Sequence, residues 1–265
     1  MDVDNKTIWI TGASSGIGLE LCRQLAGKGA RIVLSARRRD ALIEIAESLP
    51  GGMGRHWVVP LDLADADKLV DAVQSQLPEI GAVHVLINNA GISQRSLFID
   101  TDLAVYRQLM EVNYLGSVAM TKALLPGMIA QHQGMIVCIS SVAGKVGSKL
   151  RSGYSGSKFA VVGFMDCLRA ETAQQGIHCL TVCPGSIQTN IAINALNESG
   201  EAQNKNDDSI INGMPVETCV KGIVKAMIND RDEVVVGKGI SAIAPTIKRF
   251  FPRVFNRISA KMEYR

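Results

Sequence analysis

Short apolar runs alternate along the chain with longer segments in which apolar residues recur every three or four positions. A strand that is apolar at successive positions is buried on both faces, and the 3.6-residue period is typical of a helix. Alternation of the two predicts a parallel sheet with helices on both sides. We expect strands at residues 7–10, 32–35, 57–61, 83–87, 136–139, 180–182 and 234–236.

The helical segments between these strands carry apolar pairs such as Leu21/Leu25 and Leu69/Val73. The predicted fold class is α/β: a single-domain, Rossmann-like, doubly wound sheet of about seven parallel strands. Residues 1–244 form this domain. The stretch 197–209 is almost wholly polar and is expected to be a mobile surface loop. Residues 245–265 differ in composition and are treated as a C-terminal extension.

Composition narrows the classes of protein that remain. The 265 residues are 47% hydrophobic and 20% charged, which is enough for a large core. The first six residues lack the pattern of a secretory signal, and no apolar run approaches the length of a membrane span, so we expect a cytoplasmic protein. The six cysteines include no Cys-x-x-Cys pair, and no metal site is expected.

The formal net charge of +3 conceals an asymmetry, because residues 248–265 alone carry a net charge of +5. The rest of the chain is therefore slightly acidic. No nucleic-acid partner is expected on that balance.

A glycine-rich turn, Thr-Gly-Ala-Ser-Ser-Gly-Ile-Gly at residues 11–18, follows the first predicted strand and leads into a helix. Glycine permits a sharp turn and lets backbone N–H groups approach a pyrophosphate at the helix N-terminus. The position at a strand–helix junction favours a dinucleotide-binding turn over a merely structural one. The predicted contacts are Gly12, Ser14, Ser15, Gly16, Ile17 and Gly18.

Basic residues follow the second strand, where NAD-specific Rossmann proteins place an acid. No Asp or Glu occurs at residues 35–37. An arginine can bind a 2′-phosphate by charge-assisted hydrogen bonds, so Arg37, assisted by Arg38, favours NADP(H) over NAD(H). Neither Ser14 nor Ser15 is basic, so recognition would rest on Arg37. A solvated surface cluster is the alternative.

A phenol and an ammonium group, Tyr154 and Lys158, occur four residues apart at the start of an apolar helical stretch. This spacing places both on one helix face. A free tyrosine has a pKa of about 10, so it exchanges protons near neutrality only if a cation stabilises its phenolate. The pair is common on ordinary helices, and its meaning depends on the other motifs.

Those motifs occur in the order and register typical of short-chain dehydrogenases/reductases. Besides the glycine-rich turn and the Tyr154/Lys158 pair, they are Asn-Asn-Ala-Gly at 88–91, Asn113, Ser141 and Pro-Gly at 184–185. The chain resembles this family from about residue 6 to residue 237. The resemblance implies an oxidoreductase that interconverts a carbonyl and an alcohol.

Four catalytic roles follow from the resemblance. Tyr154 would be the general acid/base, and Lys158 would lower its pKa and hold the nicotinamide ribose. Ser141 would bind the substrate carbonyl oxygen, and Asn113 would support a proton-relay water. Charge develops on that oxygen as hydride arrives, so two donors directed at it stabilise the transition state.

The resemblance also implies the rest of the cofactor site. Its residues would be Asn89, Ala90, Gly91, Tyr154, Lys158, Pro184, Gly185, Ile187 (through its backbone) and Thr189. Asp62 and the adjacent Leu63 would approach the adenine, although Asp62 is equally well explained as an N-terminal helix cap.

Two segments are expected to shape the substrate site, residues 142–153 and the substrate loop at about 186–214. A hydrophobic ketone, aldehyde or secondary alcohol is suggested by the apolar residues of these segments. They are Val142, Val146, Leu150, Ile191, Ile193, Leu196 and Met214. Lys145, Lys149 and Arg151 are the only candidates for binding an anionic substrate, and a solvated position is favoured for each.

The C-terminal extension has helical spacing of Phe251, Val254, Phe255, Ile258 and Met262, with Arg253, Arg257 and Lys261 on another face. Pro252 suits a first helical turn. A helix packed on its own domain or on a partner subunit is favoured. Peripheral contact with an anionic membrane is the alternative.

The principal hypothesis is an NADP(H)-dependent carbonyl reductase or alcohol dehydrogenase. A 3-oxoacyl thioester reductase and a non-catalytic NADP(H) sensor are the alternatives. The resemblance also suggests a homodimer or homotetramer built on the helices after Asp102 and around Tyr154.

Overall fold

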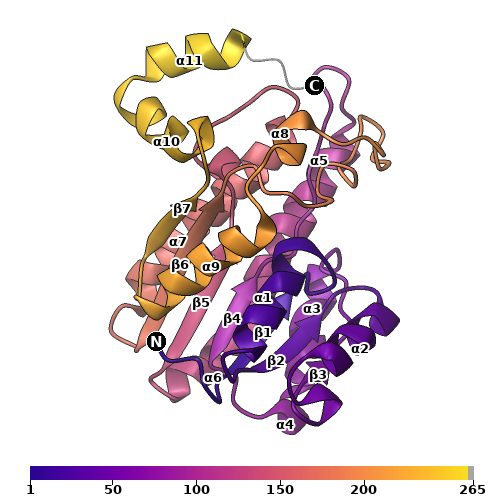
Figure 1. Cartoon of the computed structure of the whole chain (residues 1–265), viewed down its shortest axis with the longest axis vertical. Helices are drawn as coiled ribbons and strands as arrows, with labels where there is room; N and C mark the ends of the chain where they lie inside the picture. The colour runs from indigo at the N-terminus through magenta and orange to yellow at the C-terminus, as the bar shows by residue number, and fades with distance from the viewer. Residues whose placement is uncertain (262–265) are drawn as a thin grey trace.

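The computed structural model describes residues 1–261, and in this part of the chain seven parallel strands form one sheet in the order β3-β2-β1-β4-β5-β6-β7 (Figure 1). The predicted fold class is confirmed. The strands are β1 (Thr7–Thr11), β2 (Arg31–Ser35), β3 (Trp57–Val58), β4 (Val85–Asn88), β5 (Gly134–Ile139), β6 (Ile177–Pro184) and β7 (Glu233–Val236).

Helices connect the strands and cover both faces of the sheet (Figure 1). The α-helices are α1 (Gly16–Ala26), α2 (Arg39–Ser48), α3 (Ala66–Gln74), α4 (Leu77–Ile80), α5 (Leu103–Met110), α6 (Gly116–Ala130), α7 (Ser152–Thr172), α8 (Asp208–Ile211), α9 (Val216–Ile228), α10 (Ile240–Phe250) and α11 (Pro252–Lys261). Short 3₁₀ turns occur at η1 (Gly52–Gly54) and η3 (Val142–Gly144), and a π-helical turn, η2 (Glu111–Leu115), joins α5 to α6.

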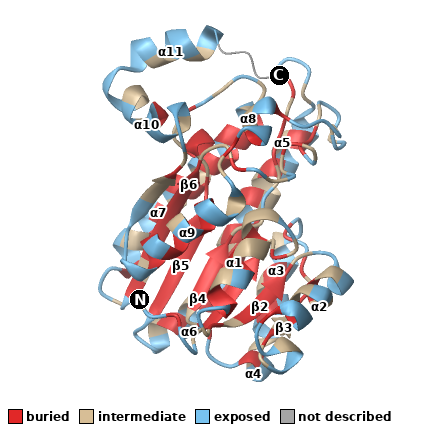
Figure 2. Ribbon diagram, in the orientation of Figure 1, coloured by how far each residue is buried: buried red, intermediate tan, exposed pale blue. Residues whose placement is uncertain are grey.

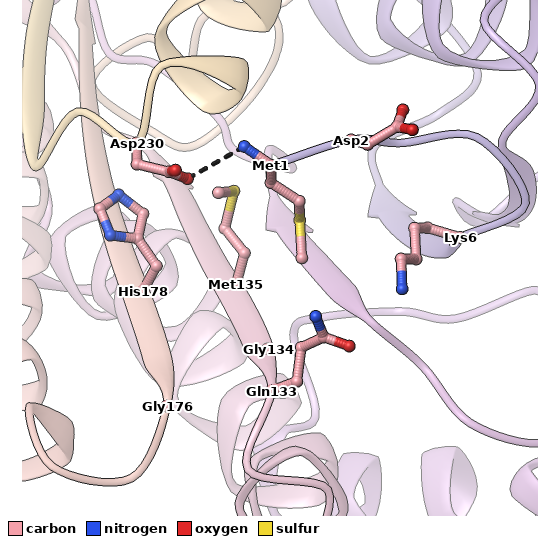
Figure 3. A pocket seen from close by; sticks show the side chains of 9 residues that line it. All are labelled: Met1, Asp2, Lys6, Gln133, Gly134, Met135, Gly176, His178 and Asp230. Atoms are coloured by element: carbon pink, nitrogen blue, oxygen red, sulfur yellow. Dashed lines mark hydrogen bonds and ion pairs between the residues drawn. The ribbon is translucent and has the colours of Figure 1, made fainter.

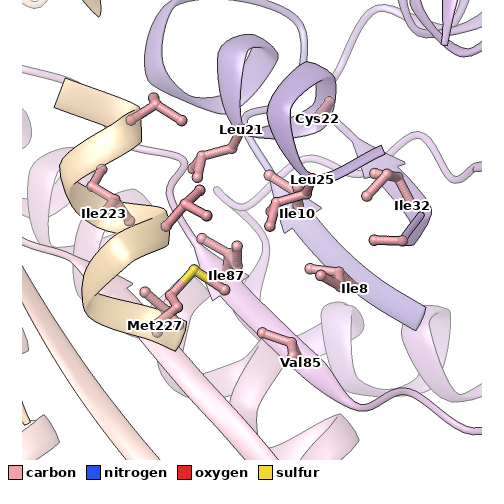
Figure 4. Close-up of a cluster of buried hydrophobic side chains, with 14 of the residues drawn as sticks. Ile8, Ile10, Leu21, Cys22, Leu25, Ile32, Val85, Ile87, Ile223 and Met227 are labelled. Carbon is pink, nitrogen blue, oxygen red and sulfur yellow. The ribbon is translucent and has the colours of Figure 1, made fainter. Parts of the chain in front are cut away.

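The two faces of the sheet carry separate apolar cores, because successive side chains of a strand point to opposite faces. Ile8 and Ile10 of β1 pack with α1 and α9 on one face, as Figure 4 shows. Trp9, between them, packs with α3 and α6 on the other face. Figure 2 shows the resulting buried sheet between partly exposed helices.

Strand β3 is shorter than the predicted 57–61. Val59 and Leu61 still donate backbone hydrogen bonds to β2 and to Ala36, at 3.0 and 3.1 Å. Regular pairing with β2 covers only Trp57 and Val58. Strand β6 is longer than predicted and extends over eight residues.

The polar stretch 197–209 is more closely tied to the protein than its composition indicates. Leu196 and Ala202 form a bridge, and the stretch runs into α8. Asp207 is buried, because it forms ion pairs with Arg95 and Arg151.

The C-terminal extension forms two helices. Helix α10 spans the boundary between residues 244 and 245, and α11 begins at Pro252, as predicted. Met262 of the predicted apolar stripe lies outside the described residues. Within residues 1–261, none of the helices combines the length and apolar character needed to cross a membrane.

Candidate active site

The sheet places the predicted motifs at one edge. Strands β2 and β3 are added on one side of β1, and β4 to β7 are added on the other side. Parallel α/β sheets bind ligands at the carboxyl ends of the strands beside such a switch point, which here lies between β1 and β4. The glycine-rich turn follows β1, and residues 88–91 include the end of β4. Ser141 follows β5, and Gly185 follows β6. These motifs are distant in sequence but lie together at the carboxyl ends of the strands, which we call the carboxyl edge of the sheet.

The turn after β1 has the geometry of an anion-binding loop. Gly12 has φ +66°, and a Cβ at Gly18 would lie 2.1 Å from the carbonyl oxygen of Gly12, so a side chain fits at neither position. Ser15 is the N-cap of α1, but its side chain makes no capping hydrogen bond in the described structure. The first-turn N–H groups of α1 therefore suit a phosphate ligand.

Thr11 and Asn89 hold this turn against the end of β4. Thr11 Oγ1 accepts hydrogen bonds from the backbone N–H groups of Asn89 and Ala90, at 3.0 and 3.1 Å. The Asn89 amide donates to the carbonyl oxygens of Thr11 and Gly12, at 2.9 and 3.3 Å. Predicted cofactor residues from both strands are thus brought together.

Arg37 and Arg38 are both exposed at the junction of β2 and α2. The preceding Ser35 is buried and accepts a hydrogen bond from Trp9 Nε1 at 2.9 Å, while its carbonyl oxygen accepts from Ala13 N at 3.0 Å. The basic pair thus follows a fixed strand end beside the glycine-rich turn.

Asp62 is exposed and accepts a hydrogen bond from Ala64 N at 3.1 Å. The alternative explanation of Asp62 as a helix cap is wrong, because the N-cap of α3 is Asp65. Leu63 is buried, and its side chain lies where a Cβ on Gly116 of α6 would be. Because the Leu63 side chain packs against α6, only the Leu63 backbone is available to a ligand.

Tyr154 and Lys158 lie on α7 and are 7% and 4% exposed. The Lys158 ammonium lies 6.0 Å from the centre of the Tyr154 ring and donates a hydrogen bond to the carbonyl oxygen of Ile139 at 2.8 Å. Ser140 Oγ donates to the carbonyl oxygen of Lys158 at 2.9 Å. The end of β5 therefore fixes both the charge and the backbone of this lysine.

Asn113 lies in the π-helical turn η2, a feature often found at functional sites. Its amide group donates to Ile92 O at 3.0 Å and to Ser157 Oγ at 2.8 Å. A Cβ on Gly91 would lie 3.0 Å from Asn113 Oδ1 and 3.2 Å from Lys158 Nζ. Glycine at this position therefore lets Asn113, Lys158 and the end of the Asn-Asn-Ala-Gly motif converge.

Ser141 is half-buried and is the N-cap of η3. Its Oγ accepts from Ala143 N at 3.0 Å and donates to the carbonyl oxygen of Pro184 at 3.4 Å. The hydroxyl thus connects the ends of β5 and β6 and holds one weak donated bond that a substrate oxygen can replace.

The segment after β6 folds back over the glycine-rich turn. A Cβ at Gly16 would lie 3.2 Å from Thr189 Cγ2. Ile187 is buried in the core and pairs with Met214, so its backbone is the part available to a ligand, as the resemblance implies. Gly185 packs against Ser241 at the start of α10.

Gln94 is a functional candidate that sequence reasoning missed. It is fully buried, and its Oε1 accepts hydrogen bonds from Gly153 N and Tyr154 N, at 2.8 and 3.3 Å. Both N–H groups belong to the first turn of α7, where backbone N–H groups have no acceptor within the helix. No motif or periodicity marks Gln94; a lone amide in a short polar segment was the only signal.

Two of the three candidate cations near the substrate segments are engaged. Lys145 pairs with Glu233, and Arg151 pairs with Asp207. The solvated position expected for Arg151 is therefore wrong, because its guanidinium group pairs with the buried carboxylate of Asp207. Val142 and Val146 also differ from expectation, because they pack against Ala244 and Phe255 of the C-terminal helices.

Burial raises the pKa of Cys138 to about 12, and it raises that of Cys183 to about 12. These thiols of β5 and β6 therefore stay protonated and are poor nucleophiles. Among the described residues, no group of three or more His, Cys, Asp or Glu side chains is placed to hold a metal ion.

A separate surface hollow lies at the opposite end of the sheet (Figure 3). Its lining includes Met1, Gly134 at the start of β5 and His178 near the start of β6. The N-terminal ammonium of Met1 pairs there with Asp230 at 3.2 Å. The hollow is remote from the motifs at the carboxyl edge.

Fold and site together define a dinucleotide-binding α/β protein of the Rossmann type. The model of the short chain dehydrogenase family matches residues 6–200. The chain therefore belongs to the short-chain dehydrogenase/reductase family and is an oxidoreductase acting on CH–OH groups.

Similar proteins cover nearly the whole chain. Dehydrogenase/reductase SDR family member 7B of Bos taurus is 39% identical over 264 residues, which are 97% of this chain and 81% of that protein. Dehydrogenase/reductase SDR family member 7 of Homo sapiens is 40% identical over 260 residues, 95% of this chain and 76% of that protein.

Solved structures share the fold. A short-chain dehydrogenase/reductase from Burkholderia phymatum in complex with NAD superposes with a TM-score of 0.83 at 21% identity, covering 99% of this chain and 98% of that one. One from Burkholderia cenocepacia in complex with NADP gives 0.81 at 23% identity, covering 99% and 100%.

Proposed function

We propose that this protein is an NADP(H)-dependent reductase that interconverts a hydrophobic ketone or aldehyde with its alcohol. The observation that carries the proposal is the convergence of Tyr154, Lys158 and Asn113 beside Gly91 at the carboxyl edge of the sheet. Bound there, the nicotinamide would supply hydride to the carbonyl carbon, or accept it from the alcohol.

The chain's own residues would handle the proton and the developing charge. In reduction, the Tyr154 hydroxyl gives its proton to the carbonyl oxygen while Ser141 donates a hydrogen bond to that oxygen. The Lys158 ammonium stabilises the phenolate that remains, and a relay through water supported by Asn113 returns the proton from solvent. Oxidation of the alcohol runs through the same groups in reverse.

The preference for NADP(H) is supported by charge at the end of β2. Arg37 and Arg38 are exposed, and no acidic residue at 35–37 is available to bind an adenosine ribose. A guanidinium group can bind a 2′-phosphate with two hydrogen bonds.

An uncharged substrate is supported by the state of the nearby cations. Of the three candidate cations, Lys145 and Arg151 are paired with carboxylates and are not free to bind an anion, and Lys149 is exposed. Leu150, Ile191 and Met214 are half-buried in the segments next to the site and offer apolar contacts.

Consumption of NADPH tests the reaction, measured with aliphatic, aromatic, steroid-like and acyl-thioester carbonyls. Tyr154→Phe should lower turnover roughly 100- to 10,000-fold while leaving the dissociation constant for NADPH nearly unchanged, because only the transferable proton is removed. Tight NADPH binding without turnover of any compound would favour a sensor. Turnover of acyl thioesters alone would favour the 3-oxoacyl thioester reductase.

A second measurement tests the cofactor preference. Arg37→Ala should weaken NADP(H) binding roughly tenfold or more and change NAD(H) binding little, because only the former has a 2′-phosphate. Arg39→Ala is the matched control, since Arg39 is also exposed but begins α2. Equal weakening for both cofactors would contradict the assignment of Arg37.

We also propose a homo-oligomer. Its support is the exposed apolar residues on the helices that the family uses for association: Leu103 of α5, Leu115 of η2 and Phe159 of α7. Light scattering after gel filtration, with Phe159→Gln as the variant, tests this part of the proposal.

A further inference from the structure

The two C-terminal helices present an apolar surface to solvent. Six large apolar side chains of α10, α11 and the residue between them are between 41% and 66% exposed: Ile240, Ile243, Phe250, Phe251, Val254 and Ile258. We call these six residues the C-terminal apolar face. Ile240 and Ile243 of α10 are three residues apart, and Val254 and Ile258 of α11 are four residues apart, so the exposed apolar side chains of each helix share a face.

This face is not left over from an unfolded tail, because the other side of the helix pair is anchored. Ala244 and Phe255 pack with Val142 and Val146, which follow Ser141. Ser259 Oγ also donates to the carbonyl oxygen of Gly147 at 3.4 Å. The helix pair, at the top of Figure 1, is thus fixed beside the carboxyl edge of the sheet.

Exposed cations accompany the apolar face. Arg249, Arg253 and Arg257 are exposed, and no acidic residue occurs between residues 240 and 261. On α11 the arginines occupy positions i and i+4, next to the row formed by Val254 and Ile258. Figure 2 shows α11 as almost wholly solvent-exposed.

The positive charge of the C-terminal helices indicates what binds to this surface. A second copy using the same face would bring the cationic helices of the two molecules together, with no carboxylate in residues 240–261 to compensate. An anionic lipid bilayer offers both an apolar layer and negative headgroups, which is what an amphipathic helix with basic residues binds. We propose that α10 and α11 dock the protein on the surface of an anionic membrane, next to the candidate active site.

Flotation with lipid vesicles tests the proposal independently of any enzymatic activity. The full chain should bind phosphatidylcholine vesicles that contain phosphatidylserine, and it should bind vesicles of phosphatidylcholine alone much more weakly. Arg249→Gln/Arg253→Gln/Arg257→Gln should reduce the partition coefficient onto anionic vesicles roughly 100-fold, because each cation near such a surface contributes about a fivefold gain. Phe250→Gln/Phe251→Gln should reduce it about tenfold or more.

Matched controls separate this surface from general effects. Lys28→Gln and Met53→Gln change an exposed cation and an exposed apolar residue outside the C-terminal helices, and they should leave vesicle binding unchanged. Circular dichroism establishes that each variant is folded. Absence of vesicle binding by the wild type would overturn the proposal, as would equal binding by the triple arginine variant. Dimers that dissociate on Phe250→Gln/Phe251→Gln without any vesicle binding would assign the face to a second copy instead.

Discussion

Gln94 caps the helix that carries Tyr154, because its Oε1 accepts hydrogen bonds from the backbone N–H groups of Tyr154 and Gly153. Its amide nitrogen donates to Ser96 and Thr101, at 3.0 and 3.2 Å. The segment after β4 thus fixes the start of α7, and through it the position of Tyr154, without touching the phenol.

Gln94→Ala should therefore lower turnover while leaving NADPH affinity nearly unchanged. The substitution leaves two buried N–H groups without a partner, at about 1–3 kcal/mol each. Displacement of Tyr154 should reduce kcat roughly 10- to 100-fold. Steady-state kinetics and NADPH titration measure the two effects separately.

Gln94→Glu is the conservative comparison, since a carboxylate still accepts from α7 but no longer donates to Ser96 and Thr101. It should retain more activity than Gln94→Ala. Equal kcat for wild type and Gln94→Ala would show that α7 needs no cap from this segment.

The turnover number should depend on the hydrogen bonds that the Asn113 amide nitrogen donates more than on the one that its oxygen accepts. Its Oδ1 accepts from Ile92 N at 2.8 Å, and its amide nitrogen donates to Ile92 O and Ser157 Oγ. Asn113→Asp keeps the acceptor but places a carboxylate against the carbonyl oxygen of Ile92. We expect Asn113→Asp to lower kcat at least as much as Asn113→Ala, measured at saturating NADPH. A fully active Asn113→Asp would contradict this account.

The sequence predicted the elements whose signal is local and periodic. Strand β1 and helix α1 follow from successive apolar residues and from the Leu21/Leu25 spacing. The site motifs lie at strand ends, so a correct sheet order brings Gly12, Asn89 and Ser141 to one edge.

Contacts between distant polar residues were not predictable in the same way. Gln94, Asp207 and Arg151 lie in irregular segments with no period to mark burial. Whether such a side chain is buried depends on a partner far along the chain, as Asp207 depends on Arg95. The π-helical turn at Asn113 likewise has no pattern in the apolar residues of α5 and α6.

Asp207 should be a strong anchor of the loop at residues 197–211. Its Oδ2 lies 2.6 Å from Arg95 Nη2 and 3.3 Å from Arg151 Nη2, and all three side chains are at most 15% exposed. Asp207→Ala leaves buried guanidinium groups without this carboxylate, which should destabilise the protein by about 3–5 kcal/mol. Urea unfolding measures the loss.

A local readout separates the loop from the rest of the fold. In Asp207→Ala, hydrogen exchange of residues 197–211 should accelerate more than exchange of β1 and β4. Asp208→Asn is the control, because Asp208 is the exposed neighbour. Uniform acceleration across the sheet would argue that Asp207 serves the whole core instead of the loop.

Protein stability should fall as pH drops below about 6.5, because two histidines are held neutral. His56 is 2% exposed; its Nδ1 accepts from Ile32 N at 3.0 Å, and its Nε2 lies 3.0 Å from the carbonyl oxygen of Pro50, which can only accept. Burial lowers the pKa of His56 from its ordinary 6.5, and burial also lowers that of His84, whose Nδ1 accepts from Thr7 N. Protonation would break these bonds at Nδ1.

The sign follows from proton uptake. Below pH 6.5 the unfolded chain protonates both histidines while the folded chain does not, so the free energy of unfolding decreases as pH falls, until the lowered pKa values are reached. Each group contributes up to about 1.4 kcal/mol per pH unit. Urea unfolding at pH 7.5 and 5.5 should show this loss in the wild type and about half of it in His56→Gln. His132→Asn, at an exposed position, should keep the wild-type pH dependence, and a wild type equally stable at both pH values would show that neither imidazole is held neutral by the fold.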